Sequence, residues 1–166
     1  MRYRLAPMSA PSSPEIVVRA AAPTEITRLT TLLVAQLREH DLPTAVEAVA
    51  ASVAGTLRDP ERGFILAATV NGMVEGVAFV SFVRPLEHAG EVAWLEELYV
   101  TPAWRDRGLG RRLVDEVIAR AEARGCGSVE LEVEADHGRA AHLYQREGFR
   151  PMRRVHWVRP LQGWDW

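Results

Sequence analysis

A glycine-bearing segment that follows a short apolar run is the part of the sequence best suited to chemistry. Leu98 to Val100 is typical of the end of a β-strand, Pro102 ends it, and Gly108 and Gly110 come soon afterwards. A helical pattern of apolar residues begins near Gly108. The start of a helix directs unpaired backbone N–H groups and a positive dipole end at whatever lies before it. The segment therefore predicts an anion site, for which a phosphate is the natural ligand.

The residues after the glycines exclude two common phosphate-binding loops. A Walker loop needs a lysine and then Ser or Thr after its second glycine, whereas Arg111 and Arg112 follow Gly110. A dinucleotide fingerprint needs a small third residue where this chain has Leu113. What remains is the pattern Arg105-x-x-Gly108-x-Gly110.

A second motif follows at some distance. Gly125-Cys126-Gly127 makes a break, residues 128–134 alternate apolar side chains with glutamates, and Ala140-x-x-Leu143-Tyr144-x-x-x-Gly148-Phe149 comes next. In this order the two motifs closely resemble the Arg/Gln-x-x-Gly-x-Gly/Ala loop and the A-x-x-L-Y-x-x-x-G-F signature of the GCN5-related N-acetyltransferases (GNAT family). The resemblance extends from about Ile16 to Leu161, and residues 95–149 carry its specific signals.

The resemblance implies that acetyl-coenzyme A (acetyl-CoA) is the co-substrate. In this family the loop holds the cofactor pyrophosphate, and the pantetheine arm enters between the splayed fourth and fifth strands. His137 stands where the family often has Asn; imidazole also forms hydrogen bonds, and a proton-transfer role for His137 stays open. The implied cofactor-binding residues are Leu98, Tyr99, Val100, Arg105, Arg107, Gly108, Leu109, Gly110, Arg111, His137, Ala140 and Tyr144.

Acetyl transfer to an amine needs a base for the amine, a polarised thioester carbonyl and a proton for the departing thiolate. Glu96 lies where some GNAT members carry a proposed base that acts through water, and it is the first candidate. Glu97, on the opposite face by strand alternation, is the reserve. Tyr144 resembles the family tyrosine proposed to protonate the thiolate. The alternative to these catalytic roles is that Glu96 and Glu97 are ordinary glutamates of a strand and that Tyr144 is a tyrosine of the core.

The expected function is therefore acetyl-CoA-dependent N-acetyltransfer to a primary amine by direct attack in a ternary complex. The alternative is a non-catalytic acyl-CoA-binding sensor or interaction module, which needs neither Glu96 nor Tyr144, and transfer of a longer acyl group also stays open. The acceptor is a small molecule or a peptide. Acidic residues expected to border its groove favour a cationic one: Glu39, Asp41, Glu87, Glu91, Glu96, Glu97, Glu132 and Glu134.

Composition narrows the remaining classes. A chain of 166 residues with 48% hydrophobic content is of the size of one domain. Its formal charge of −2 does not indicate the basic surface that binding of nucleic acid requires. The single cysteine, Cys126, forms no internal disulfide and is consistent with the cytoplasm. No apolar run approaches the roughly 20 residues that span a membrane. The histidines are too scattered to indicate a metal site.

We expect three parts: a flexible N-terminal tail (1–14), an N-acetyltransferase domain (15–161) and an aromatic C-terminal tail (162–166). Trp164 and Trp166 in that tail are expected to dock on the domain or on a second subunit, which would make a homodimer.

The elements that position the motifs follow from periodicity and turn signals. The fold class is α+β, a GNAT fold with a mixed, mostly antiparallel sheet of six to seven strands and four helices. Asn71-Gly72 is expected to form the turn of a hairpin. Strands are expected at 16–20, 63–70, 73–83, 91–100, 128–134 and 153–159, and helices at about 23–41, 44–57, 109–123 and 139–147.

Overall fold

The structure is a computed structural model that describes residues 13–42, 44–134, 137–159 and 161. Nearly all of the expected N-terminal tail and the whole expected C-terminal tail, with Trp164 and Trp166, lie outside the described residues. Among the helices of the described ranges, none has the length and apolar character needed to cross a membrane.

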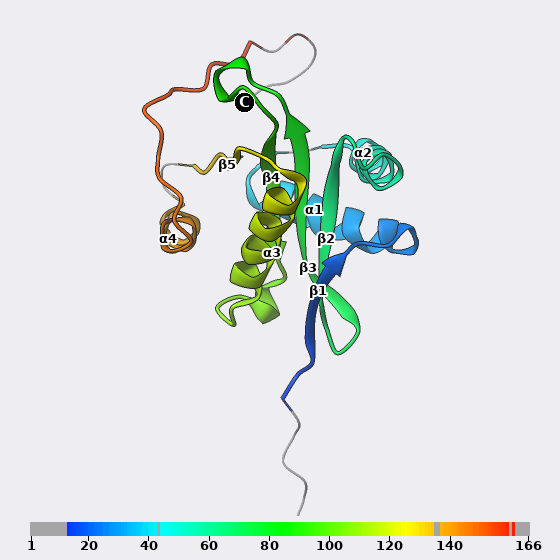
Figure 1. Ribbon diagram of the computed structural model, residues 1–166. Helices are drawn as coiled ribbons and strands as arrows, with labels where there is room; N and C mark the ends of the chain where they lie inside the picture. The colour runs from blue at the N-terminus through cyan, green and yellow to red at the C-terminus, as the bar shows by residue number, and fades with distance from the viewer. Residues whose placement is uncertain (1–12, 43, 135–136, 160, 162–166) are drawn as a thin grey trace, which may run out of the picture.

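A mixed sheet forms the centre of the molecule (Figure 1). Its strands lie in chain order, with β1 to β4 antiparallel and β4 parallel to β5, which confirms the mixed, mostly antiparallel sheet. The described residues form five strands rather than the expected six to seven. They are β1 (Ile16–Ala20), β2 (Gly63–Val70), β3 (Met73–Val83), β4 (Val92–Val100) and β5 (Ser128–Leu131).

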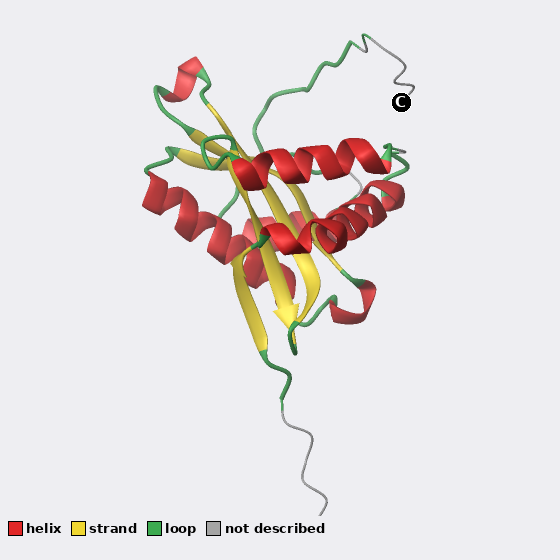
Figure 2. Ribbon diagram, turned by 90° about the vertical axis from the view of Figure 1, so that its right-hand side faces the viewer, coloured by secondary structure: helices red, strands yellow, loops and turns green. Residues whose placement is uncertain are grey.

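Four α-helices accompany the sheet, as expected: α1 (Ile26–Glu39), α2 (Val46–Arg58), α3 (Leu109–Arg124) and α4 (Gly138–Arg146). Short 3₁₀ turns lie at Pro23–Glu25 (η1), Leu86–His88 (η2) and Pro102–Trp104 (η3). Figure 2 shows the strands as a twisted layer with helices on both sides. The core is accordingly divided in two, because α1 and α2 pack on one face of the sheet and α3 packs on the other.

The hairpin between β2 and β3 has the expected turn. Asn71 and Gly72 both have positive φ angles, of 48° and 80°, and Val70 pairs with Met73. A turn of this kind needs the left-handed conformation at both central positions, which Asn and Gly tolerate best. Local chemistry was therefore sufficient to predict it.

The expected final strand at 153–159 was wrong. The segment forms no strand; the Val155 side chain is 77% exposed and that of Trp157 is 89% exposed. The segment forms ion pairs between His156 Nδ1 and Glu132 Oε1, at 2.7 Å, and between Arg154 and Glu87. A strand-like sequence forms a strand only where a backbone edge pairs with it.

A β-bulge interrupts β4. Leu95 pairs with Val80 and Glu97 pairs with the adjacent Phe79, so Glu96 is the extra residue. An extra residue reverses the alternation of side chains beyond it. Leu95 and Leu98 thus both pack on the α3 side of the sheet, whereas Tyr99 packs with α1 and α2.

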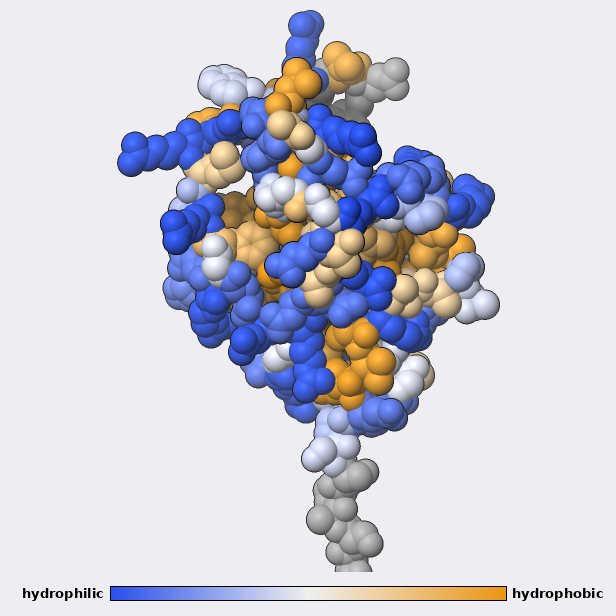
Figure 3. Space-filling view, in the orientation of Figure 1, coloured by the Kyte–Doolittle hydropathy of each residue, from blue (hydrophilic) through white to orange (hydrophobic). Residues whose placement is uncertain are grey.

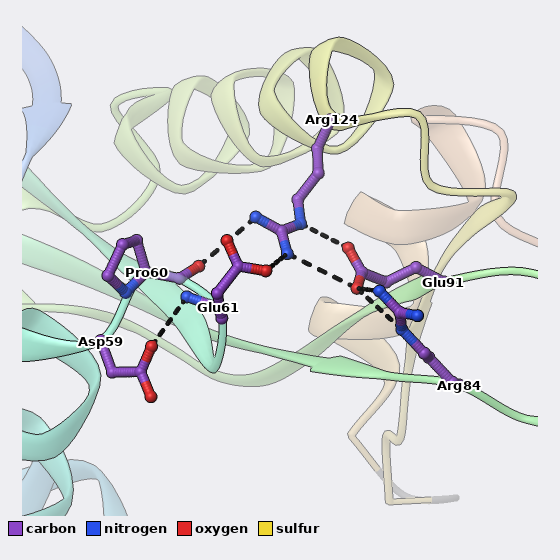
Figure 4. A network of polar contacts seen from close by, with 6 residues as sticks. All are labelled: Asp59, Pro60, Glu61, Arg84, Glu91 and Arg124. Atoms are coloured by element: carbon purple, nitrogen blue, oxygen red, sulfur yellow. Dashed lines mark hydrogen bonds and ion pairs between the residues drawn. The ribbon is translucent and has the colours of Figure 1, made fainter.

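An ion-pair network fixes the beginning of β4 (Figure 4). Glu91 accepts hydrogen bonds from Arg124 at the end of α3 and from Arg84, whose Nε and Nη2 lie 3.2 and 3.1 Å from Oε2. Arg124 Nη2 also donates to Glu61 at 2.8 Å. These arginines, Arg124 foremost, hold the pKa of the Glu91 carboxyl below its usual range. The network joins β4 to α3 and to the loop before β2, and so aligns the strand that carries the candidate site.

Candidate active site

The loop before α3 has the geometry expected of an anion site. Asp106 and Gly108 have φ angles of 60° and 80°, and Gly108 caps the helix. The Arg112 N–H donates to the Gly108 carbonyl at 3.1 Å. The amides of Leu109, Gly110 and Arg111 precede this bond, and a helix supplies no acceptor for amides in its first turn. The helix start therefore presents donors to an anion.

Arg105 makes contacts within the protein. Its Nη2 lies 2.7 Å from Glu39 Oε2, and its Nε donates to the Val100 carbonyl at 2.9 Å. The side chain thus holds the loop to α1 and to the end of β4. Arg107 is exposed and lies over the Trp104 ring, 4.9 Å from its centroid, and Arg111 is 66% exposed beside Glu147.

The two parallel strands separate beside this loop. Pairing of β4 with β5 runs from Val92 and Ser128 to Leu95 and Leu131, where β5 ends, while β4 continues to Val100. Figure 3 shows a hollow between α3 and α4 with apolar surface at its floor. Half-buried apolar side chains of this region are Leu98, Val100, Leu131 and Tyr144.

The start of α3 approaches the neighbouring helix and strand closely at Gly110. A Cβ atom added there would lie 3.6 Å from Leu143 Cδ2 and 3.9 Å from Val100 Cγ2. Ala140, one turn before Tyr144 on α4, is half-buried. The loop, the end of β4 and α4 therefore surround one space, and the structure brings together most of the residues that the two motifs predicted.

The two candidate bases differ sharply in environment. Glu96, the bulge residue, is exposed. Glu97 is partly buried, and burial raises the pKa of its carboxyl to about 7, with the Glu96 charge adding to the rise and the His40 charge opposing it. Its pairing with Phe79 puts it on the α1 side of the sheet. A carboxyl with a pKa near neutrality is suited to proton transfer, and this property belongs to the reserve candidate.

Tyr144 lies close enough to Glu97 to feel its charge. Burial raises the pKa of the Tyr144 hydroxyl to about 12, and the negative charge of Glu97 contributes to the increase. The Tyr144 ring meets that of Phe149 edge to face, with centroids 5.6 Å apart. Phe149, which belongs to the same motif, therefore helps to fix the Tyr144 ring. The hydroxyl is protonated at neutral pH and available as a donor.

A pocket of about 260 Å³ opens beside this centre, lined by Glu39, His40, Glu134 and His137. His40 Nδ1 lies 3.4 Å from Glu134 Oε1, and the rings of His40 and His137 are 5.5 Å apart. His137 is thus exposed on the pocket rim. Sequence reasoning missed His40. Its position near the end of the helix predicted at about 23–41 was the one local signal for it, because helix ends commonly border sites.

The expected acidic groove is formed only in part. Glu39 and Glu134 line the pocket, and Glu97 lies near it. Glu91, by contrast, is engaged by Arg84 and Arg124, and Glu87 by Arg154. In the part of the chain that the structure describes, no group of three or more His, Cys, Asp or Glu side chains is arranged to hold a metal ion.

Comparison with known proteins identifies the family. A profile of the acetyltransferase (GNAT) family matches residues 26–149, which includes both motifs and the elements between them. The chain belongs to the GNAT family. The parallel strands that separate beside the glycine loop are therefore those of a GNAT domain.

Named relatives match this chain over only part of their own length. The mycothiol acetyltransferase of Beutenbergia cavernae is 46% identical over 55 residues, which cover 33% of this chain and 18% of that protein. The ribosomal protein bS18 alanine N-acetyltransferase of Escherichia coli strain K12 is 33% identical over 81 residues, covering 49% of this chain and 51% of that enzyme. The match thus spans from under a fifth to about half of these relatives.

Solved structures share the whole GNAT fold. The aminoglycoside N-acetyltransferase AAC(6')-Iy in complex with CoA superposes with a TM-score of 0.77 at 19% identity, covering 92% of this chain and 99% of that one. At this identity the likeness establishes the architecture, and the chemistry must be argued from this chain's own residues.

Proposed function

We propose that this GNAT chain transfers an acetyl group from acetyl-CoA to a primary amine by direct attack within a ternary complex. The observation that carries the proposal is the placement of Glu97 and Tyr144 near one another where β4 and β5 separate. One is a carboxyl with a pKa of about 7 and the other a hydroxyl with a pKa of about 12. Two groups with such separated proton affinities are suited to opposite proton-transfer roles.

The loop and the start of α3 fit the cofactor. The amides of Leu109, Gly110 and Arg111 would hold the pyrophosphate, and the exposed Arg107 and Arg111 would contact its charge. Bound acetyl-CoA supplies the thioester carbonyl that the amine attacks and the thiolate that leaves. Backbone groups of Leu98, Tyr99 and Val100, beyond the last β5 pair, are assigned to the pantetheine arm, with Ala140 and His137 at its α4 side.

Glu97 is assigned the role of base in place of Glu96. Burial raises the pKa of the Glu97 carboxyl to about 7, which brings its proton affinity closer to that of the ammonium group it must deprotonate. The neutral amine nitrogen then bonds to the acetyl carbon as the carbon–sulfur bond breaks, and the second proton that the nitrogen loses as the amide forms neutralises the departing thiolate. The exposed Glu96 remains within one residue of this centre and contributes negative charge to it.

Tyr144 is assigned to the departing sulfur. Its O–H donates a hydrogen bond to the thiolate, which stabilises the charge that appears as the carbon–sulfur bond breaks. Because its pKa of about 12 exceeds the roughly 8.5 of a thiol, complete transfer of the proton is uphill by about three pKa units. Stabilisation by a donated hydrogen bond is therefore the larger part of its contribution.

Direct attack is favoured over a covalent acyl-enzyme. The chain has one cysteine, Cys126, which lies after the C-terminal end of α3, at the other end of that helix from the glycine loop. Burial raises the pKa of the Cys126 thiol, which makes it a weak nucleophile. A ternary complex predicts intersecting rather than parallel double-reciprocal lines.

The acceptor is proposed to be a small molecule or a peptide that carries a cationic amine. The pocket next to Glu97 presents the carboxylates of Glu39 and Glu134, which would attract a positive charge. The relatives and the solved structure are named for mycothiol, for the alanine of ribosomal protein bS18 and for aminoglycosides, so the acceptor class must be found by experiment.

The test is release of free thiol from acetyl-CoA across amines and short peptides, with Tyr144→Phe as the matched variant. We expect one acceptor class to stimulate release. In the variant, turnover should fall about 10- to 100-fold, the value of a hydrogen bond to a charged group, while the Kd for CoA stays within about threefold. Tight CoA binding without stimulated release from any acceptor would favour the alternative, a non-catalytic acyl-CoA-binding module.

A further inference from the structure

The end of α1 is fixed directly over the catalytic end of β4. Glu39, the last residue of α1, accepts a hydrogen bond from the Tyr99 hydroxyl at 3.1 Å. Because Tyr99 and Glu97 face the same side of β4, the residue that follows Glu39 is held near Glu97. That residue is His40, whose N–H closes the helix by donating to the Gln36 and Leu37 carbonyls at 3.2 Å each.

The His40 side chain extends from this point toward the pocket. Its Nδ1 meets Glu134 at 3.4 Å, and its ring centroid lies 5.5 Å from that of His137. The His40 side chain is 25% exposed, whereas Glu134 is 58% exposed. His40 is therefore the more buried of the two, and the carboxylate of Glu134 on the pocket rim orients it.

We propose that His40, held at the end of α1 by the Glu39–Tyr99 contact and oriented by Glu134, is a positioning residue for the base Glu97. The inference rests on the proposed function and adds a residue to it. The pocket then serves as the route by which protons leave the centre, from Glu97 to water at the rim.

The groups that face the pair from neighbouring elements determine the sign of the effect. Glu97 is faced by Glu96 of its own strand, by His40, which follows the last residue of α1, and by Tyr144 of α4. His40 is faced by Glu39, Glu134 and His137. Among these, protonated His40 is the charge that favours ionisation of Glu97, while Glu96 opposes it. Loss of His40 must therefore increase the proton affinity of Glu97.

The experiment compares His40→Asn with His142→Asn, an exposed histidine of α4. The first readout is the titration of the Glu97 carboxyl by ¹³C NMR in the ligand-free protein, with Glu97→Gln used to assign the signal. The second is the pH profile of kcat/KM. In His40→Asn we expect the carboxyl titration and the acidic limb of kcat/KM to move upward together by about half a pH unit or more. His142→Asn should move neither.

The readouts separate this inference from the proposed function. If His40→Asn only disturbed packing, kcat would fall at every pH and the acidic limb of the kcat/KM profile would stay in place. Thermal denaturation of the variant would reveal such a loss of packing. An upward shift of the carboxyl titration without acetylation of any acceptor would support the coupling and defeat the proposed function. Acetylation with an unchanged carboxyl titration in His40→Asn would overturn the inference and leave the proposed function standing.

Discussion

Arg105 Nη2 lies between the two carboxylate oxygens of Glu39, 2.8 Å from Oε1 and 2.7 Å from Oε2. The pair joins the end of α1 to the loop before α3, across more than sixty residues of sequence. It also holds the pKa of the Glu39 carboxyl below its usual range, with Arg105 the main opponent of the burial that would raise it. An arginine that the motif assigns to the cofactor thus connects the acceptor side of the site to the cofactor side.

A double-mutant cycle should measure this connection. Arg105→Ala and Glu39→Gln should each lower the free energy of unfolding by about 1 kcal/mol, because the pair is partly exposed and screened by solvent. The double variant should cost less than the sum, with a coupling of about 0.5 kcal/mol or more. Urea denaturation of the four proteins gives these values, and additive losses would show that the two side chains do not interact.

The two glutamates of the bulge form a matched pair for activity. Glu97→Gln should lower kcat/KM by about 10² or more, since a positioned base contributes that much. Glu96→Gln should stay within about threefold of the parent, because the Glu96 side chain is exposed to solvent at the bulge. Steady-state kinetics at about pH 8 decide between them. The reverse order would return the role of base to Glu96.

The same carboxyl should make stability depend on pH. The pKa of Glu97 is raised to about 7 in the folded chain, while a glutamate in an unfolded chain titrates near 4.3. Between those values the folded chain binds more protons, so this residue makes stability fall as pH rises from about 4 to about 7. Glu97→Gln should therefore be more stable than the parent by roughly 1–3 kcal/mol at about pH 8 and equal to it near pH 4.

Chemical denaturation at these two pH values measures the difference. If Glu97→Gln is as stable as the parent at both pH values, the charged Glu97 carboxylate does not destabilise the folded chain. A gain of stability together with loss of activity is the expected signature of a functional residue held in an unfavourable environment.

The glycines at the two ends of α3 separate strain from cofactor binding. Gly108 and Gly125 have φ angles of 80° and 84°, and a Cβ atom added to either meets nothing within 4 Å. Gly108→Ala and Gly125→Ala should therefore each cost a similar ~1–2 kcal/mol of stability, from backbone strain alone. Only Gly108→Ala should also weaken CoA binding, by roughly tenfold, because its methyl group would crowd the phosphate loop. Calorimetric titration with CoA tests this, and equal affinities would remove the loop from the cofactor site.

Much of the fold followed from local sequence signals. Asn71-Gly72 specified the hairpin, and the apolar spacing after Gly108 specified α3, because turn chemistry and helical periodicity act over a few residues. The strand at 153–159 was wrong for the opposite reason. Its alternation is that of a strand, but pairing requires a free backbone edge, which the local sequence does not contain.

The candidate site likewise has some features that the local sequence determines and others that depend on the tertiary structure. The order of the two motifs by itself determined the family and the elements that meet where β4 and β5 separate. Only the tertiary structure decided which glutamate is partly buried, because the bulge at Glu96 depends on how β4 pairs with β3. It also decided that Arg105 meets Glu39 and that His40 meets Glu134 at the pocket. Charge and burial depend on neighbours distant in the chain, and folding alone brings those neighbours together.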